Sequence, residues 1–244
     1  MTELADETIV TPKIRRRTSG DAATAAEQIK ALILGQHLKP GDSLPTESEL
    51  TSTLGISRSS VREALRHLEA LDIVKVRRGV GAFVGPLSMS ALVETLAFKT
   101  ILTAGNDLQA LREVIAVRRY LDLGLAPTVC QTLRGNPQPG LETLVRLMRT
   151  KAEAGQTFPD EDFAFHDGIL ALLNNDLARQ LVASFWQVHL AALRSMEPPN
   201  HESLLTSASA HGEILRAATA GNIAEYQQAI IRHYSPVYSA LNLT

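Results

Sequence analysis

The chain has 244 residues, with 24 Lys and Arg, 26 Asp and Glu, and a net charge of −2. This length allows one large domain or two smaller ones, and a hydrophobic content of 45% is enough for packed cores. No apolar run approaches the roughly 18–20 residues that a membrane helix needs, and the N-terminus has no signal-peptide core. The single cysteine, Cys130, excludes an internal disulfide. These features predict a cytoplasmic protein that does not enter a membrane.

Charge is distributed unevenly along the chain. Residues 57–85 contain six Lys or Arg and three Asp or Glu, a local charge of +3. Residues 87–244 contain 12 Lys or Arg and 15 Asp or Glu, a local charge of −3. A basic segment joined to an acidic one indicates a nucleic-acid reader with a separate sensor. We predict a disordered tail over 1–20, which contains Arg15, Arg16 and Arg17 and lacks apolar periodicity.

Residues 40–71 have the pattern of two short helices joined by a tight turn. Thr46 and Glu49 can form a capping box on the first helix, and Gly55 allows the chain to reverse. Ser57 is placed to cap the second helix. The apolar residues of that helix recur at three- and four-residue spacing, which predicts one buried stripe. The stripe consists of Val61, Ala64, Leu65, Leu68 and Leu71.

The rest of this second helix is polar and basic, and a basic hairpin is predicted after it. The residues that lie off the stripe, free to contact a partner, include Arg58, Ser59, Arg62 and Arg66. Cations and hydroxyls near a helix N-terminus suit the major groove of DNA. Two β-branched runs, 73–76 and 82–84, flank a glycine-containing turn and predict the hairpin. A solvated charged face would explain either half alone, but their order favours DNA binding.

This segment resembles the N-terminal domain of the GntR superfamily of bacterial transcription regulators, over about residues 22–85. The matching residues are Gly35, Pro40-Gly41, Leu44-Pro45, Glu47, Glu49-Leu50, Ser57-Arg58, Val61-Arg62-Glu63-Ala64-Leu65 and the Gly79/Gly81 hairpin. The resemblance implies a winged helix-turn-helix over 21–85 and a homodimer that binds a double-stranded DNA operator. It also implies that DNA is contacted by Ser57, Arg58, Ser59, Ser60 and Arg62, and that Arg78 and Gly79 of the wing enter the minor groove. The chain departs from the family at Ser48, where members often have Arg, and at Asp72, where glycine is usual.

After a linker at 86–88 the pattern becomes entirely helical. Helices are predicted over 88–103, 107–134, 139–154, 160–174, 176–196, 203–220 and 222–241. Each of them ends at a combination of Gly, Asn or Pro that is typical of helix ends. The sequence therefore predicts a mainly α protein, with an all-α bundle of six or seven helices over 89–244.

Four polar residues are predicted to face the apolar interior of this bundle. Asp162 and His166 are four residues apart on an apolar helix face, and His211 and His233 lie on apolar faces of two further helices. A buried carboxylate needs a cation, and imidazole lone pairs need donors, so one divalent ion would satisfy all four. Any one of these histidines alone would more often be an ordinary core residue. The remaining histidines lack an acidic partner on a buried face: His37, His67, His189 and His201.

The set Asp162, His166, His211 and His233 looks like the metal-binding residues of the FCD effector domain, which defines the FadR-like branch of the GntR superfamily. The resemblance spans about residues 90–240. It implies a divalent metal that holds the carboxylate of a small metabolite, with zinc expected and nickel or manganese as alternatives. It also implies that Arg118 binds that carboxylate, although an ion pair with a neighbouring acid would explain this arginine too. The aromatic residues Trp186 and Tyr120 either line the cavity or pack in the core.

Together these features predict a metabolite-responsive transcriptional regulator, a repressor rather than an activator, and not an enzyme. Two alternatives stay open. The helical domain could hold an acyl-coenzyme A or other bulky ligand in a metal-free pocket. It could also be a metal-dependent enzyme, since three histidines and a carboxylate with open positions can activate water. No further acid is clearly placed as its general base.

Overall fold

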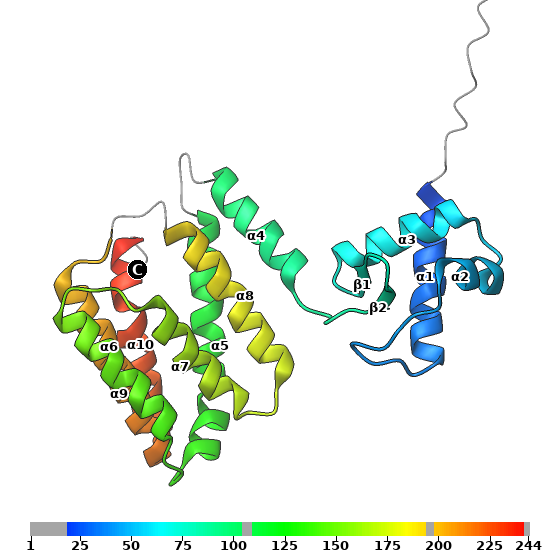
Figure 1. The fold of residues 1–244 in the computed structure, drawn as a ribbon. Coiled ribbons are helices and arrows are strands. Elements are labelled where there is room, and N and C mark those ends of the chain that lie inside the picture. Colours follow the sequence, from blue (N-terminus) through cyan, green and yellow to red (C-terminus); the bar gives the residue numbers. More distant parts are fainter. Residues whose placement is uncertain (1–18, 104–108, 194–197, 242–244) are drawn as a thin grey trace, which may run out of the picture. The chain divides into compact units, whose positions relative to one another are not determined.

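The structure, a computed structural model, describes residues 19–103, 109–193 and 198–241 (Figure 1). The chain divides into two compact units, Met1–Ser88 and Met89–Thr244. Among the described residues, the first unit has three helices and a β-hairpin, and the second has seven helices. The predicted mainly α class, a winged helix-turn-helix followed by a helical bundle, is confirmed. The predicted tail lies outside the described residues up to position 18, and the first helix begins at Ser19.

The winged unit is built on three helices and one two-stranded sheet. Its elements are α1 (Ser19–Gly35), α2 (Glu47–Leu54), α3 (Arg58–Ala70), β1 (Val74–Arg77) and β2 (Gly81–Val84). Helix α1 packs against both α2 and α3, and α3 packs against β1. The strands are antiparallel, with Val74 opposite Val84 and Arg77 opposite Gly81. The core contains Ile29, Leu50, Val61, Leu65, Leu68 and Val74, all buried.

The predicted helix ends are present, with one correction. Thr46 and Glu49 form the capping box of α2, Gly55 ends that helix in the left-handed region (φ 66°), and Ser57 caps α3. Leu71 was predicted as part of the buried stripe, and this is wrong. It is 42% exposed because α3 ends at Ala70, and Leu71 itself has left the helical conformation (ψ 8°).

Position 72, before the wing, has Asp where glycine is usual, and the local backbone shows how Asp is accommodated. Its backbone adopts φ 54°, the left-handed region that glycine favours and that Asp tolerates better than most residues. The Asp72 carboxylate accepts a hydrogen bond from Ser88 Oγ, and its carbonyl accepts from Leu87 N–H (3.0 Å). Gly85 lies directly against this turn, where a Cβ would overlap the Asp72 carbonyl oxygen. The chain therefore leaves the hairpin through a turn with no space for a side chain at position 85.

The second unit is a bundle in which α5 has the most neighbours. Its helices are α4 (Ser90–Thr103), α5 (Gln109–Leu133), α6 (Pro139–Glu153), α7 (Pro159–Ala171), α8 (Asp176–Leu193), α9 (His201–Ala220) and α10 (Ile223–Ala240). Helix α5 contacts α4, α8, α9 and α10, while α7 packs against α6 and α8 (Figure 1). The seven predicted helices are confirmed, apart from shifts of a few residues at their ends. None of the described helices is long and apolar enough to cross a membrane.

Candidate functional site

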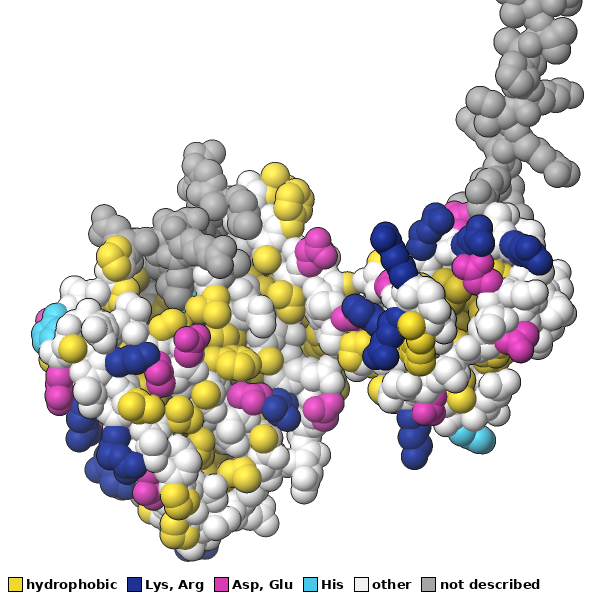
Figure 2. Space-filling view, in the orientation of Figure 1, with side chains coloured by type: hydrophobic (Ala, Val, Ile, Leu, Met, Phe, Trp, Pro, Cys, Tyr) yellow, Lys and Arg dark blue, Asp and Glu magenta, His cyan; other side chains and the backbone are white. Residues whose placement is uncertain are grey.

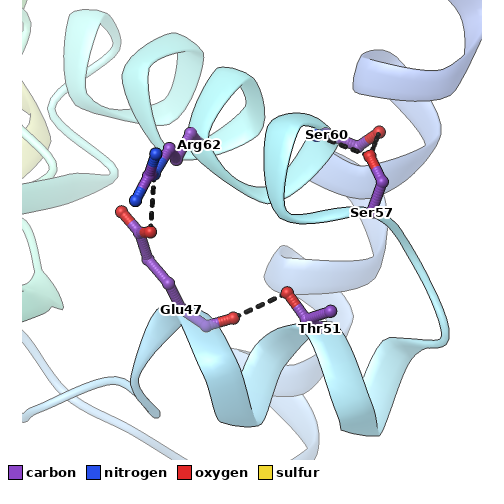
Figure 3. A network of polar contacts seen from close by, with 5 residues as sticks. All are labelled: Glu47, Thr51, Ser57, Ser60 and Arg62. Atoms are coloured by element: carbon purple, nitrogen blue, oxygen red, sulfur yellow. Dashed lines mark hydrogen bonds and ion pairs between the residues drawn. The ribbon is translucent and has the colours of Figure 1, made fainter.

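The N-terminus of α3 carries a cluster of serine hydroxyls. Ser57 Oγ accepts from the Ser60 N–H (3.1 Å) and lies 2.9 Å from Ser60 Oγ (Figure 3). It also lies 2.8 Å from Ser59 Oγ. Arg58, in the same turn, is exposed. Hydroxyls and free N–H groups at a helix N-terminus form a site that favours phosphate. The sequence-predicted residues of this turn are therefore grouped at the surface in a way that suits a DNA backbone.

The sequence suggested that Arg62 is free to contact a partner. It lies at the surface of α3, but it is held in an ion pair. Its Nε donates to Glu47 Oε2 (2.7 Å), which links α3 to the start of α2 (Figure 3). The Arg62 side chain is 60% exposed. Thr51 Oγ1 donates to the Glu47 carbonyl (2.8 Å) within α2. A contact between Arg62 and DNA would have to exchange this exposed ion pair for a phosphate or a base edge.

The tip of the hairpin presents a cation and a glycine to solvent. Gly79 adopts φ 75°, and Val80 N–H donates to the Arg77 carbonyl (3.0 Å), which closes the turn. The Arg77 guanidinium lies over the Phe83 ring, 4.8 Å from its centroid, whereas Arg78 is exposed. Figure 2 shows Lys and Arg side chains gathered in the region that α3 and the hairpin occupy in Figure 1. This unit therefore presents a basic surface despite the chain's negative net charge.

In the helical unit, the four predicted metal ligands lie together. Helix α7 supplies Asp162 and His166, α9 supplies His211 and α10 supplies His233, and one ligand atom from each lies within 4.8 Å of the others. The imidazole centroids of His211 and His233 are 4.5 Å apart, and those of His166 and His233 are 4.9 Å apart. All four residues are buried, with at most 9% of their surface exposed. Residues 71 positions apart in the chain thus converge on one buried point.

The atoms that face this point have no hydrogen-bond partner among the described residues. They are Asp162 Oδ1, His166 Nε2, His211 Nε2 and His233 Nδ1. Asp162 Oδ1 lies 3.4 Å from both His166 Nε2 and His211 Nε2, yet forms a hydrogen bond with neither. Buried polar atoms are nearly always partnered, and leaving one unpaired costs about 1–3 kcal/mol. Four such atoms converging on one point fit a divalent cation.

Hydrogen bonding and electrostatics set these groups in metal-binding form. His211 Nδ1 lies 2.8 Å from the Ser207 carbonyl. A carbonyl oxygen can only accept, so Nδ1 carries a proton, and in the tautomer with one ring proton Nε2 keeps its lone pair. Burial lowers the pKa of His166 and of His233 well below the ordinary value. Burial alone would raise the pKa of the Asp162 carboxyl, but His211, His233 and Arg118 hold it below its usual value.

Arg118 is fully buried beside this cluster. It is 1% exposed, and its Nε and Nη2 have no hydrogen-bond partner in the described part of the chain. Its guanidinium lies over the Trp186 ring, 4.4 Å from the centroid, and 5.7 Å from the Tyr234 centroid. Asp122, one turn along α5, accepts a hydrogen bond from Tyr234 Oη (2.6 Å). Burial opposes the charge of Arg118, but Tyr234, Asp122 and Asp162 raise its pKa, so it stays a cation.

The neighbouring arginines of α5 have other roles, which separates Arg118 from them. Arg112 Nε donates to the Leu241 carbonyl (2.8 Å) at the end of α10. Arg119 lies over the Tyr238 ring, 4.7 Å from its centroid. Helix α5 continues through Pro127. Arg118 and Asp122 share one face of this helix because they are four residues apart. Of these three arginines, Arg118 is therefore the one next to the buried cluster.

A small cavity, with room for about one water molecule, lies against Arg118 and His166. Its other lining residues are Phe163, Asp167, Leu170, Arg179, Val182, Ala183 and Trp186. Arg179 and Asp167 form a bidentate ion pair (2.6 and 2.8 Å) that neutralises both charges. Trp186, for which the sequence left cavity lining and core packing open, is both buried and part of this lining. Tyr120, the other candidate, is 66% exposed and is absent from the lining.

Sequence reasoning missed three residues of this region. Asp122 follows Arg118 by four positions, and Tyr234 follows a predicted ligand, so spacing could have indicated both. His189 was not predicted as a site residue, because it lacks an acidic partner on a buried face. In the structure both of its ring nitrogens are buried without a hydrogen-bond partner among the described residues. Its ring packs edge-on against Trp186, with the ring centroids 5.6 Å apart and the ring planes at 84°. Helical periodicity did not reveal this, because the setting depends on how α8 packs against α5 and α7.

Comparison with known proteins agrees with this architecture. Residues 21–84 match the model of the bacterial regulatory proteins of the gntR family, and residues 113–235 match the FCD domain. The chain belongs to the GntR family of FCD-containing regulators. It is therefore a transcriptional regulator whose winged unit binds DNA, and not an enzyme. FCD domains are often metal-binding, in keeping with the cluster of Asp162 and the three histidines.

Several individual proteins are similar to this regulator. The HTH-type transcriptional regulator LutR of Bacillus subtilis is 26% identical over 215 residues, which cover 86% of this chain and 96% of LutR. The galactonate operon transcriptional repressor of Escherichia coli is 24% identical over 152 residues, 62% of this chain and 66% of that protein. Among solved structures, Streptococcus agalactiae GntR superposes with a TM-score of 0.64 at 26% identity, covering 89% of this chain and 99% of that one.

Proposed function

We propose that this regulator is a repressor that senses a small carboxylic acid through a divalent metal in its helical unit. In this proposal residues 21–85 bind the operator, 86–88 form a linker and 89–244 hold metal and effector. The observation that carries it is the convergence of four unpartnered ligand atoms within 4.8 Å, next to the buried Arg118. Such a site attracts a cation and an anion together.

The metal would be held by the Asp162 carboxylate and the His166, His211 and His233 imidazoles. When bound, the ion supplies a Lewis acid with one or two positions open to a ligand oxygen. One carboxylate and three nitrogen ligands suit zinc, with nickel or manganese as alternatives. The Ser207 carbonyl fixes the His211 tautomer, so this residue needs no rearrangement to act as a ligand.

Arg118 would bind the effector's carboxylate. Two of its nitrogens lack hydrogen-bond partners among the residues that the structure describes, and a guanidinium can donate two parallel hydrogen bonds to one carboxylate. The Asp122 carboxylate, with Tyr234 bonded to it, provides a charge that keeps Arg118 cationic without occupying its Nε or Nη2. The face of the Trp186 ring lies 4.4 Å from the guanidinium carbon and limits the positions that the guanidinium can take.

For DNA, we propose contacts from both parts of the winged unit. The serines Ser57, Ser59 and Ser60 would hold phosphate at the N-terminus of α3, and Arg58 and Arg62 would reach base edges or phosphate in the major groove. Arg78 and Gly79 would enter the minor groove from the wing. A homodimer would place two such units on a roughly palindromic operator.

The relatives support repression and an acidic effector. One of them is named as a repressor of a galactonate operon, and galactonate is a sugar acid. Effector binding would release the operator only if the effector binds the DNA-free conformation more tightly than the DNA-bound one. The alternative effector, an acyl-coenzyme A in a metal-free pocket, is disfavoured. The cavity beside Arg118 has room for about one water molecule, far less than the roughly 300–1,000 Å³ of sites for drug-sized ligands.

A gel-shift titration tests the proposal. The operator is first selected from random DNA with purified, zinc-loaded protein, and candidate acids are then added to the protein–DNA complex. We expect at least one small carboxylic acid to weaken operator binding by about tenfold or more, and an Arg118→Gln variant to lose this response while still binding DNA. If no acid alters operator affinity in metal-loaded protein, the sensor proposal is wrong.

A further inference from the structure

Helix α4 is apolar on two opposite faces. Among the described residues it packs mainly against α5 and α8, both on the same side of it (Figure 1). The face toward these helices consists of buried or partly buried residues: Val93, Leu96, Ala97 and Thr100. The opposite face, here called the outer face of α4, carries Leu92, Phe98 and Leu102, which are 40%, 65% and 71% exposed.

The composition of α4 is that of a helix with a partner on each side. Its charged residues are Glu94 and Lys99, which lie between the two faces. Thr95, on the outer face, donates its hydroxyl to the Ala91 carbonyl (2.8 Å) of its own helix. A surface helix normally turns a polar face to water, whereas a helix that is apolar all round is normally buried. The outer face of α4 therefore has the composition of an interface.

An apolar groove lies beside this face, between α4, α5 and α8. Its volume is about 200 Å³, and its lining includes Leu96, Val117 and Phe185. The lining also includes Lys99 and Glu113, which form an ion pair (3.5 Å) from α4 to α5. An apolar cavity of roughly 150 Å³ can hold a benzene ring, so the groove has room for a large apolar side chain.

The exposed apolar area around the groove is of the size that a dimer needs. Val117 and Tyr120 of α5 are 42% and 66% exposed, and they continue the surface formed by the outer face of α4. At roughly 150–250 Å² for each large side chain, the exposed parts of these five residues amount to on the order of 500 Å² in each copy. Two copies would bury on the order of 1,000 Å², to which flanking polar residues add, and specific interfaces bury about 1,200–2,000 Å².

A second copy of this chain fits this surface better than other partners do. A symmetric dimer brings the same patch of both copies together, so one patch must contain both the exposed side chains and the recess that receives them. This patch contains Phe98 and Leu102 next to the groove. Its charge is balanced, with Lys99 against Glu113, whereas a nucleic acid or an anionic membrane would require a net positive charge.

We propose that the outer face of α4 and the adjoining groove form the interface of a homodimer, in which apolar side chains of each copy enter the groove of the other. This inference rests on the proposed function, because a palindromic operator calls for two copies. Helix α4 begins at Ser90, two residues after the winged unit ends at Ser88. Pairing of the two α4 helices would therefore fix the two points from which the winged units extend.

Analytical ultracentrifugation of full-length, zinc-loaded protein over a range of concentrations tests this interface. Phe98→Glu and Leu102→Glu each place a carboxylate on the outer face, and Leu147→Glu, at a 45% exposed leucine of α6, is the matched control. We expect wild type and Leu147→Glu to be dimers, and either α4 variant to have a dissociation constant raised about 30-fold or more, as for an interface hot spot. Circular dichroism should match wild type, because both substituted side chains are exposed in the single chain. If one α4 variant fails to fold, the other carries the same comparison.

DNA binding gives a second readout that misfolding would not reproduce. Each protein is titrated with its selected operator and with a single half-site of that operator. The α4 variants should bind the half-site as wild type does, but should lose the gain of about tenfold or more that two linked copies obtain on the full operator. Loss of half-site binding as well would show damage to the winged unit and would contradict the inference.

A photoreactive benzoylphenylalanine in place of Phe98 identifies what covers the outer face. We expect a covalent dimer whose cross-links join this position to α4, α5 or α8 of the other copy. Cross-links confined to one chain would overturn the inference. A dimer that persists in both α4 variants would also overturn it, and the homodimer of the proposed function would then stand on another interface. If wild-type protein is a monomer that binds its operator as one copy, the proposed homodimer itself fails.

Discussion

The two units of this regulator place their polar residues in opposite ways. In the winged unit, Arg58 and Arg78 are exposed, and the serine hydroxyls at α3 are bonded to one another at the surface. In the helical unit, Arg118, Asp162 and the three clustered histidines are buried, and several of their atoms lack hydrogen-bond partners within the part of the chain that the structure describes.

This difference indicates two kinds of ligand. An exposed cation is solvated by water when no partner is bound. A DNA-binding surface made of such residues therefore costs the free protein little free energy. A buried unpartnered atom costs free energy, and that cost is recovered when a ligand fills the site. The winged unit should therefore be stable without DNA, while the helical unit should gain stability from metal and effector.

Removal of a metal ligand should have the largest effect. We expect wild-type protein to bind about one zinc ion per chain and to be stabilised by it, and His211→Ala to lower metal affinity by more than about 100-fold. Metal content after dialysis and thermal unfolding with and without zinc measure this. His201→Ala, on the same helix but exposed, is the control and should behave as wild type. Equal metal content in both variants would contradict the site.

A change at Gly85 should affect one unit and not the other. Gly85→Ala pushes a Cβ into the Asp72 carbonyl, and we expect it to destabilise the winged unit by about 2–3 kcal/mol. Hydrogen exchange should rise in peptides from α3 and the hairpin, while Trp186 fluorescence, which reports on the helical unit, should follow the wild-type unfolding curve. Gly35→Ala, where a Cβ meets nothing, serves as the control. Parallel loss in both units would mean that they unfold together.

Loss of a surface arginine should weaken DNA binding alone. Arg58→Ala or Arg78→Ala should each reduce operator affinity by about tenfold, with metal content and effector affinity unchanged. Fluorescence anisotropy at several salt concentrations measures this, since loss of a phosphate contact also reduces the salt dependence. Arg146→Ala, an exposed arginine of α6, should leave DNA affinity as it is. An equal loss for Arg146→Ala would place the DNA surface elsewhere.

The smallest effect is expected from the Glu47–Arg62 ion pair. Glu47→Gln removes the charge that holds Arg62, so Arg62 can turn to DNA without breaking an ion pair. Exposed pairs contribute about 0.2–1 kcal/mol, and we expect operator affinity to rise by roughly two- to fivefold. The rise should vanish in the Glu47→Gln, Arg62→Ala double variant. A fall in affinity on Glu47→Gln alone would show that the pair positions Arg62 for DNA.

Local sequence determined most of the elements and both candidate sites. The Thr46–Glu49 capping box, the αL turn at Gly55 and the Ser57 cap depend on interactions within three residues, so they could be predicted from spacing. The metal candidates could be predicted as well, because four-residue spacing and apolar faces already direct Asp162 and His166 inward. Leu71 was misassigned, since a periodic stripe does not show where its helix ends.

What only the tertiary structure decided is which polar atoms are left without partners. Two hydrogen bonds join residues of different helices: Arg62 with Glu47, and Tyr234 with Asp122. His189 and Trp186 lie on one helix, α8, but their burial depends on how α8 packs against its neighbours. Sequence spacing fixes neighbours on one helix, because the backbone sets their geometry. Contacts between helices depend on packing, which many residues determine together. The set of residues that lines the cavity is therefore seen only in the folded chain.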